Sequence, residues 1–434
     1  MKTRFKSIAA LFLAFLLVLT ACGGGGDTGK TSDSQGGEQG GNDQVEIHFF
    51  HRWPNEPKKT YFDQAAEAFM KDHPNVKIKV ESVLNDSYKE KIGVLVSSND
   101  IPDIFTSWSD SFALNLVRSE KVRELDDLYQ EDTEWASNIM ESQKKGFTFD
   151  GKCYGVPLTV DGKAFFYNKD VFEKEGLQEP KTYDEFIQLL DKLKAAGFEQ
   201  PLVCGLTDPW AISHYMGPIF DRLVPADVRE KDYNIKTGEF TDPGYVEGLK
   251  MFKQLTTYMG DISNSVDHEA TRNMFMNGEV PVIFLQLAEI RYLEKVENPI
   301  NYGYFNFPEV TGGKGDQHTL EGAPEGFMLS KDAPKEAIEF LKFLTSSEAA
   351  ANFTKETGEL TAIEGGVNKD TASEAAIEAY ELIKSADMIS PWFDNAVDIK
   401  IGDIFMRGGQ SLAIDQTTPE EIMKNVQEEA AKLR

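Results

Sequence analysis

Strand-like and helix-like segments alternate from Val45 onward, and this alternation constrains the fold more than any other feature. Residues 45–50 (VEIHFF) combine β-branched and aromatic side chains, which favours a strand. Residues 61–71 place their apolar side chains on one helical face, and residues 76–80 alternate apolar side chains with lysine, as a half-buried strand does. A chain that opens with strand, helix and strand predicts an α/β fold built in layers.

The same patterns recur along the rest of the chain. Further strands are predicted over residues 103–105, 165–167, 280–284, 302–307 and 326–329. Further helices are predicted over residues 88–96, 112–118, 182–195, 243–258, 335–344, 373–383 and 419–433. The last helix has a clear start, because Thr418, Pro419 and Glu421 match a capping box with proline in the first turn. With 434 residues, the chain is long enough for two or three domains.

The N-terminus has the composition of an export signal. Residues 1–6 hold three basic side chains and residues 8–19 are almost wholly apolar, which predicts a signal peptide over 1–21. The sequence LTAC that ends at Cys22 resembles the bacterial lipobox, in which the cysteine is lipidated and becomes the mature N-terminus. Residues 22–44 are glycine-rich and polar, which predicts a flexible tether. The alternative is an ordinary signal peptide with an incidental cysteine.

Charge and motif content narrow the function. The formal net charge of −27 argues against binding to nucleic acid, which requires basic groups to neutralise phosphates. The sequence contains no GxSxG, P-loop, HExxH or CxxC motif, so we expect no catalytic nucleophile of those types, no metal site and no cofactor. Cys153 and Cys204 could pair in an exported protein. A predicted domain boundary lies between them, and we favour two unpaired, mostly buried thiols.

Several ordered segments resemble one known family. These are residues 101–104 (IPDI), 154–157 (YGVP), 166–170 (FYNKD) and 325–330 (EGFMLS). Together they resemble the extracellular solute-binding proteins of family 1, the lipoprotein receptors of bacterial ABC importers, and among them the receptors for maltodextrins and other oligosaccharides. The resemblance spans nearly all of residues 45–434.

The resemblance implies a fold. It implies an α/β, two-lobed periplasmic-binding-protein-like architecture with a hinge and a cleft between the lobes. Lobe one would comprise residues 45–160 plus 307–357, and lobe two would comprise residues 161–306 plus 358–434. A ligand would bind in the cleft and close it by bending the hinge.

The chemistry of a sugar directs the choice of site residues. Its C–H faces favour an aromatic ring, and its hydroxyl groups favour charged hydrogen-bonding partners. Four of the five tryptophans lie in turn or loop sequence beside polar residues, whereas Trp135 lies in acidic helical sequence. Matched to the family pattern, the resemblance implies these ligand-binding residues: His51, Arg52, Trp53, Trp108, Asp110, Asp161, Lys163, Asp208, Trp210, Gln286, Glu325 and Trp392. The family often has tryptophan near Gln286, so the number of sugar subsites stays open.

The resemblance also implies a function without bond cleavage. We expect a monomer, anchored by lipid to the outer face of the cytoplasmic membrane of a Gram-positive bacterium, that captures an oligosaccharide and delivers it to ABC transporter permease subunits. The mixture of acids and aromatic residues favours a short β-linked or amino-sugar oligomer. We also expect Trp392→Ala to weaken binding while leaving stability near wild type. One alternative is a receptor for a peptide, polyol or sugar phosphate. The other is a surface glycoside hydrolase, which would need two carboxyl groups across a scissile bond.

Overall fold

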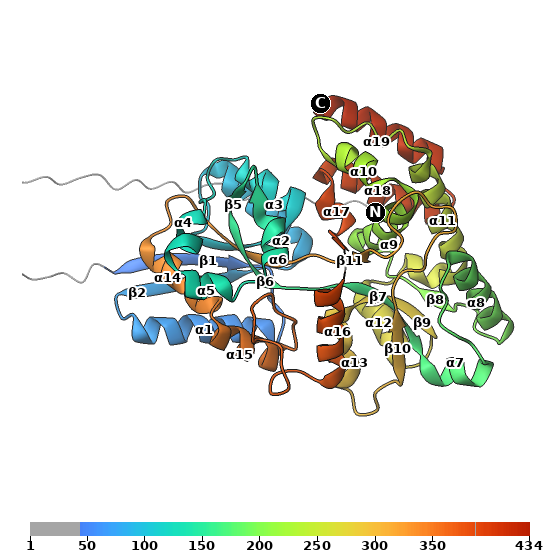
Figure 1. Ribbon diagram of the computed structural model, residues 1–434, viewed down its shortest axis with the longest axis horizontal. Coiled ribbons are helices and arrows are strands. Elements are labelled where there is room, and N and C mark those ends of the chain that lie inside the picture. Colours follow the sequence, from blue (N-terminus) through green and yellow to red (C-terminus); the bar gives the residue numbers. More distant parts are fainter. Residues whose placement is uncertain (1–43, 387) are drawn as a thin grey trace, which may run out of the picture. The chain divides into compact units, whose positions relative to one another are not determined.

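The computed structural model describes residues 44–434 except residue 387. The predicted signal peptide, Cys22 and the predicted tether up to residue 43 lie outside the described residues. From Val45 onward, strands and helices alternate in the order expected for an α/β fold (Figure 1).

The first sheet has five strands in the order β2–β1–β3–β12–β6. Their bounds are β1 (Val45–His51), β2 (Val76–Ser82), β3 (Ile104–Trp108), β6 (Gly155–Thr159) and β12 (Glu325–Leu329). Strand β1 pairs in parallel with β2 and β3, whereas β12 runs antiparallel to both β3 and β6. The carboxyl ends of β1 and β3 therefore lie at the same sheet edge as the start of β12.

The second sheet has four strands in the order β10–β7–β9–β8. Their bounds are β7 (Lys163–Asn168), β8 (Leu202–Val203), β9 (Val282–Gln286) and β10 (Tyr302–Phe305). Strand β7 is antiparallel to β9 and β10, and β8 is parallel to β9. Two small pairs complete the strands: β4 (Thr148–Phe149) with β5 (Lys152–Cys153), and β11 (Leu320–Glu321) with β13 (Ile389–Ser390).

Helices cover both sheets. In the first half of the chain they are α1 (Lys58–Asp72), α2 (Asn85–Ser98), α3 (Asp110–Val117), α4 (Asp126–Glu131), α5 (Thr133–Ser137), α6 (Glu141–Lys144), α7 (Lys169–Glu175), α8 (Tyr183–Ala195) and α9 (Pro209–Leu223). They continue as α10 (Ala226–Tyr233), α11 (Pro243–Met259), α12 (His268–Met276), α13 (Ile290–Glu294), α14 (Lys335–Leu344), α15 (Ser347–Thr357), α16 (Glu374–Ser385), α17 (Phe393–Ala396), α18 (Ile399–Ala413) and α19 (Pro419–Leu433).

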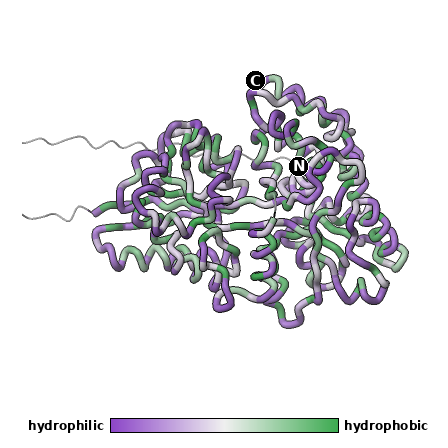
Figure 2. The backbone as a smooth tube through the Cα atoms, in the orientation of Figure 1, coloured by the Kyte–Doolittle hydropathy of each residue, from purple (hydrophilic) through white to green (hydrophobic). Residues whose placement is uncertain are grey.

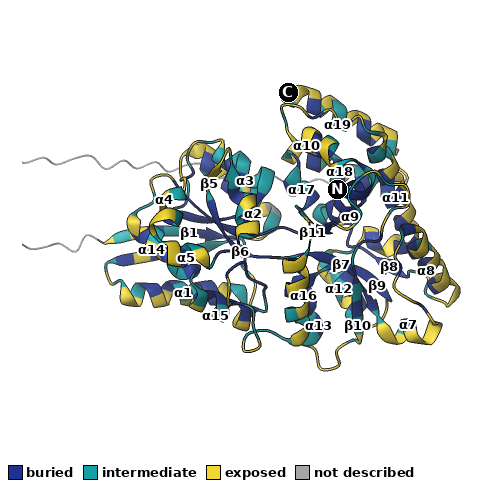
Figure 3. Ribbon diagram, in the orientation of Figure 1, coloured by how far each residue is buried: buried dark blue, intermediate teal, exposed yellow. Residues whose placement is uncertain are grey.

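Each sheet is buried on both faces, which explains its nearly continuous apolar strands. In β1, Phe49 packs toward α1 and α14, while the next residue, Phe50, packs toward α2 on the other face. In β7, Phe165 packs with α8 and α9, and Phe166 packs with α12 and α16. Figure 2 shows these central strands as hydrophobic segments, and Figure 3 shows them as buried beneath helices whose outer faces are exposed.

The chain passes between the two sheets more than once (Figure 1). Residues 160–162 connect β6 to β7 directly. A later pass runs beside this connection, because Val160 N donates to Leu360 O at 3.0 Å and Ala362 N donates to Leu158 O at 2.8 Å. Residues 306–324 lead back from β10 to β12. The predicted lobe boundaries remain a prediction; Phe307, assigned there to lobe one, packs in the core cluster of the second sheet.

The predicted elements are present, and the capping box of Thr418 and Glu421 forms at the start of α19. Several helices were missed, among them α15, α18 and α9, and Trp210, expected in a loop, lies in the first turn of α9. The helix contains Gly217 and Pro218 and is buried on nearly every side, so it has no polar face to give a helical period. The two cysteines of the body, Cys153 and Cys204, are buried and free, as we favoured.

Candidate functional site: a cleft with an aromatic and an ionic hollow

The edge of the first sheet brings together three predicted site residues. Arg52 follows β1, Trp108 ends β3, and Glu325 begins β12, where it is the register partner of Trp108. The Arg52 guanidinium donates to the Glu325 carboxylate, with Nε 2.7 Å from Oε2, and lies 4.9 Å from the centre of the Trp108 ring. The antiparallel pairing of β12 with β3 thus places residues 273 positions apart in direct contact.

The edge of the second sheet supplies a second group. Lys163 and Gln286 are register partners at the start of β7 and the end of β9. Gln286 Nε2 donates to Asp161 Oδ2 at 3.0 Å, and Asp161 Oδ1 accepts from the backbone N–H of Gly162 at 2.8 Å and Ala288 at 3.1 Å. Polar groups at the carboxyl end of β9 are therefore fixed before any ligand arrives.

Helix α9 and Trp392, the residue that precedes α17, supply the aromatic rings of the second group. The Trp392 ring stacks on the His214 imidazole, with centroids 4.3 Å apart and planes at 21°. Trp210 precedes His214 by one helical turn on α9 and meets it at 5.2 Å and 60°. Asp394, in the first turn of α17, accepts hydrogen bonds from Ser213 Oγ at 3.0 Å and Lys89 Nζ at 3.2 Å.

These groups line two adjoining hollows that share Arg52, Trp210, Gln286, Glu325 and Trp392. The aromatic hollow, of about 90 Å³, has as further lining Asn85, Lys89, Trp108, His214, Asp394 and Asn395. The ionic hollow, of about 170 Å³, has as further lining Lys58, Thr159, Val160, Asp161, His268, Arg272, Ala288, Glu289, Arg291, Tyr292, Ala323 and Glu359. We call the two hollows together the cleft.

Charged side chains in the ionic hollow are already paired. Glu289 accepts from His268 Nε2 at 2.7 Å and from Arg272 at 3.0 Å. Glu359 accepts from Lys58 Nζ at 2.6 Å and from the Arg291 guanidinium. Buried ions need such partners, because an isolated charge loses its hydration there. The pairing holds donors and acceptors in fixed positions around the hollow.

Burial and these pairs shift several pKa values. Burial raises the pKa of Asp161 to about 7, aided by the charges of Glu359 and Glu289 and opposed by its backbone hydrogen bonds. Burial alone would raise the pKa of Glu359, but Arg291 and Lys58 outweigh it and lower the pKa to about 2. Burial lowers the pKa of Lys58 to about 8. Asp161 is therefore the carboxyl group of the cleft whose charge changes near neutral pH.

Seven of the twelve residues predicted to bind the ligand line the cleft. They are Arg52, Trp108, Asp161, Trp210, Gln286, Glu325 and Trp392. They come from two sheets and two helices, yet they lie around adjoining hollows. Their role as ligand contacts remains a prediction, which the variants proposed below test.

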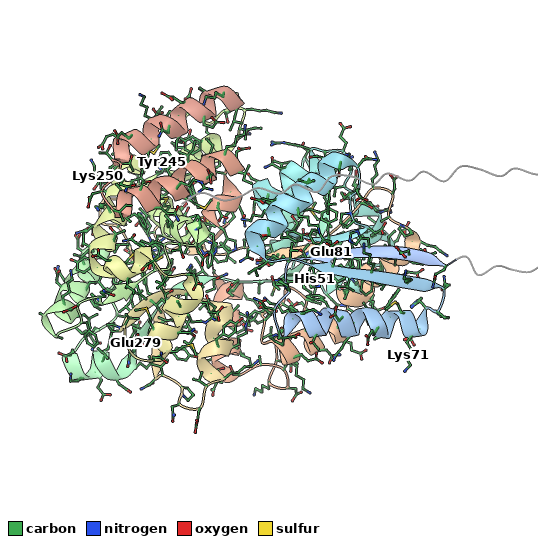
Figure 4. The ribbon with its side chains drawn as sticks, turned by 180° about the vertical axis from the view of Figure 1, so that it is seen from behind. His51, Lys71, Glu81, Tyr245, Lys250 and Glu279 are labelled. Atoms are coloured by element: carbon green, nitrogen blue, oxygen red, sulfur yellow. The ribbon has the colours of Figure 1, made fainter. Side chains whose placement is uncertain are left out.

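The other five predicted residues do not line either hollow. His51 is the last residue of β1 (Figure 4). Its ring lies 4.9 Å from that of Phe62, on which Trp53 stacks at 5.1 Å in the core of the first sheet. Side chains alternate along β1, so His51 lies on the same face as Phe49, and only Arg52 of this run lines the cleft. Burial lowers the pKa of His51 to about 3, so the ring stays neutral.

The remaining three predicted residues, Asp110, Asp208 and Lys163, do not line the cleft and have hydrogen-bond partners within the protein. Asp110 begins α3 and accepts from Ser109 Oγ, while burial raises its pKa to about 6. Asp208 accepts from the backbone N–H of His268 at 2.9 Å and so ties the start of α9 to α12. Lys163 lies beneath the lining, with Nζ 2.9 Å from His214 Nδ1. Sequence matching placed these side chains near the cleft but could not show which way they point.

Several lining residues were missed. His214 follows Trp210 by four residues and would have been found had α9 been recognised. Asp394 follows Trp392 by two residues, which was a usable signal. Lys58, Lys89 and the Arg272–Glu289 pair carry no such signal, because charged residues are abundant throughout the chain.

The described residues offer neither a metal site nor a membrane-spanning helix. Among the described residues, no group of three or more His, Cys, Asp or Glu side chains is arranged to hold a metal ion. No helix within residues 44–434, residue 387 apart, has the length and apolar character needed to cross a bilayer.

Comparison with solved structures places the fold. A chitin oligosaccharide binding protein matches with a TM-score of 0.81 and 23% identity, over 90% of this chain and 99% of that chain. RafE in complex with raffinose matches with a TM-score of 0.70 and 20% identity, over 90% of this chain and all of that one. The expected α/β, two-lobed periplasmic-binding-protein-like fold is therefore confirmed.

Comparison with known sequences gives the family. The chain is similar to the melibiose/raffinose/stachyose-binding protein MelE of Bacillus subtilis, with 23% identity over 99% of this chain and 97% of the relative. It is similar to the diacetylchitobiose binding protein DasA of Streptomyces coelicolor, with 24% identity over 89% of each chain. The family model described as "bacterial extracellular solute-binding protein" matches residues 53–351. This chain belongs to the family of bacterial extracellular solute-binding proteins.

Proposed function

We propose that this protein is a lipid-anchored receptor that captures an oligosaccharide outside the cell and delivers it to the permease subunits of an ABC importer. The observation that carries the proposal is the composition of the cleft. Two tryptophan rings, a carboxamide and an arginine–carboxylate pair face both hollows, from both sheets. Aromatic rings beside fixed polar groups match the C–H faces and hydroxyl rims of a sugar.

The lobes in this proposal are residues 45–160 plus 307–357 and residues 161–306 plus 358–434. Trp108, Arg52 and Glu325 would contact the ligand from the first lobe, and Trp210 and Trp392 from the second. A ligand that contacts both lobes binds the closed form more tightly than the open form, so it shifts the population toward closure. The closed form is the one that the permease would recognise.

No bond is broken in this proposal. The family and the relatives named above are binding proteins. The acids Glu325, Glu289 and Glu359 each accept a hydrogen bond from a basic side chain, which is Arg52, Arg272 and Lys58 respectively. If incubation with oligosaccharides released new reducing ends, the protein would be a glycoside hydrolase instead.

The test is a ligand screen on the body of the chain, residues 44–434. The panel is melibiose, raffinose, stachyose, diacetylchitobiose and mannotriose, with a dipeptide, a polyol and a sugar phosphate as the competing solute classes. A ligand present at 100 times its Kd stabilises the folded state by about 2.7 kcal/mol, which a thermal shift detects. We expect at least one sugar to raise Tm and calorimetry to give one site. Stabilisation only by another solute class would contradict the proposal.

The location is tested separately. We propose that residues 1–21 are removed, that Cys22 carries the lipid, and that residues 22–44 act as the tether to the outer face of a Gram-positive cytoplasmic membrane. Two acyl chains give a lasting anchor at about 0.8 kcal/mol per buried CH₂. Changing Cys22→Ser in the full chain should move the protein from the membrane fraction to the medium. Unchanged membrane retention would contradict lipid anchoring at this cysteine.

A further inference from the structure

The His214 imidazole lies between the aromatic hollow and a lysine buried beneath it. His214 lines the hollow and is 5% exposed, while Lys163 is 1% exposed and lines neither hollow. Lys163 Nζ lies 2.9 Å from His214 Nδ1. Within the described part of the chain, this histidine is the only hydrogen-bond partner of the ammonium group, which otherwise lies over the Trp210 and Phe284 rings at 5.4 Å and 5.2 Å.

This contact decides which ring nitrogen carries the proton. Burial lowers the pKa of Lys163, and the nearby acidic groups of Cys204, Glu321, Glu289 and Asp161 oppose that shift and favour the ammonium form. A protonated Lys163 has three donors and no acceptor, so the Nδ1 atom that faces it must accept and carries no hydrogen. A neutral imidazole then carries its hydrogen on Nε2. Burial lowers the pKa of His214 well below its ordinary value, and the positive charges of Lys163, His268 and Lys89 lower it further. The ring is therefore a neutral Nε2–H donor.

The donor nitrogen has a carboxylate opposite it across a gap. His214 Nε2 lies 4.0 Å from Asp394 Oδ1, which is too long for a direct hydrogen bond. A hydroxyl oxygen placed in the aromatic hollow can accept from Nε2–H and donate its own hydrogen to Oδ1. Stacking of Trp392 on the imidazole fixes the plane of the ring, and the bonds from Ser213 and Lys89 fix the carboxylate.

We infer that Lys163 is a positioning residue that holds His214 as the Nε2–H tautomer, and that His214 and Asp394 together recognise one free hydroxyl group of the ligand. The ligand part of the inference rests on the proposed function. A hydroxyl both donates and accepts, whereas a glycosidic or methyl-ether oxygen only accepts and an acetamido N–H only donates. The subsite therefore takes a sugar ring with an unsubstituted hydroxyl at this position.

The tautomer is tested without ligand. Histidine-selective ¹⁵N NMR of residues 44–434 is recorded from about pH 5 to about pH 8, and the His214→Gln spectrum assigns the His214 signals. We expect an unprotonated Nδ1 and a protonated Nε2 throughout. The groups that face the ring are Lys163 of β7, His268 of α12, Lys89 of α2 and Asp394 of α17. A protonated Nδ1 in the wild type would overturn the positioning role.

Two lysine variants test the cause. In Lys163→Met the donor and the positive charge are lost, so His214 should titrate at higher pH and show both tautomers. Lys424→Met, at an exposed side chain of α19, is the matched control and should leave the signals unchanged. If Lys163→Met does not fold, Lys163→Gln replaces it: the carboxamide can donate to Nδ1 or accept from it, so the signals of both tautomers should appear. An unchanged His214 spectrum in folded Lys163→Met would also overturn the positioning role.

The ligand part is tested with the panel sugar that binds the wild type most tightly. His214→Phe keeps the ring that stacks on Trp392 but removes both nitrogens, and should weaken binding about 10- to 100-fold. Asp394→Asn should weaken binding as well, and the double variant should lose less than the product of the two single losses. If the double variant loses affinity by the full product of the two single losses, or if His214→Phe binds as tightly as the wild type, the hydroxyl assignment is wrong. If no panel sugar binds the wild type, the proposed function fails, while the NMR result still decides the role of Lys163.

Discussion

The two hollows of the cleft share five residues but differ in how the chain builds them. The aromatic hollow depends on ring contacts, such as Trp392 on His214 at 4.3 Å. The ionic hollow depends on carboxylates that each contact two basic side chains, as Glu289 contacts His268 and Arg272. Ring faces suit the C–H surface of a sugar, and fixed ions suit its hydroxyls. We therefore expect loss of a ring to affect the aromatic hollow most and loss of a charge to affect the ionic hollow most.

Removing a ring from the aromatic hollow should have the largest effect. In Trp392→Ala we expect affinity for the tightest panel sugar to fall at least about 100-fold and the folded state to lose about 3–5 kcal/mol, because the indole is only 3% exposed. The structure thus changes the sequence-based expectation of unaltered stability. Calorimetry and chemical denaturation measure the two effects, and Trp392→Phe should recover part of each. Wild-type affinity in a folded Trp392→Ala would remove this ring from the site.

Neutralising an acid of the ionic hollow should act mainly on stability. Glu359→Gln leaves Lys58 and Arg291 without a buried counter-charge and should cost about 3 kcal/mol at neutral pH. The Glu359 pKa is lowered to about 2, so wild-type stabilisation is present above its unfolded value of 4.5 and is lost as pH falls toward 2. The difference in free energy of unfolding between Glu359→Gln and the wild type should therefore become smaller as pH falls from 4.5 toward 2. The control is Glu173→Gln, at an exposed side chain of α7. An equal loss of stability in Glu173→Gln would contradict the role of the buried charge of Glu359.

Asp161 should give a pH effect of the opposite sign. Its pKa is raised from 3.8 to about 7, so the folded state binds the proton more tightly than the unfolded state does. Wild-type stability should therefore fall as pH rises from about 4 to about 7, relative to Asp161→Asn, which does not titrate there. Thermal denaturation of both proteins across this range measures the difference. A constant difference in Tm would show that Asp161 does not titrate near neutrality.

The smallest effect is expected at the rim of the aromatic hollow. Lys89 of α2 contacts Asp394 of α17 at 3.2 Å and is partly exposed, so the pair contributes about 0–1 kcal/mol. Lys89→Met should weaken sugar binding by no more than about 5-fold, and added salt should reduce the difference from wild type. Titration calorimetry at low and high salt measures this. A loss as large as that of Trp392→Ala would erase the contrast between ring and ion contacts.

Helices with a capping box and an apolar stripe were predictable, whereas α18 was missed although it is long, because Gly402, Gly408 and Gly409 break its helical pattern in the sequence. Helices α8 and α19 have capping boxes and an apolar stripe, and both were predicted within about a residue of their bounds. Helix α9 was missed because it is apolar all round and contains Pro218. Among the tryptophans, Trp53 and Trp392 have similar sequence surroundings beside proline. One packs in the core of the first sheet and the other lines the cleft.

The α/β alternation, the candidate export signal and lipidation motif, and the types of side chain available for a sugar site can all be read from the amino-acid sequence. These depend on local periodicity and on short motifs, which neighbouring residues specify. Which of those side chains face a common cleft depends on how the chain folds in three dimensions. Arg52 meets Glu325 because β12 returns antiparallel beside β3, and Lys163 lies under His214 because α9 packs over the edge of β7. Such contacts depend on strand pairing and side-chain direction across long sequence separations, which no local pattern encodes.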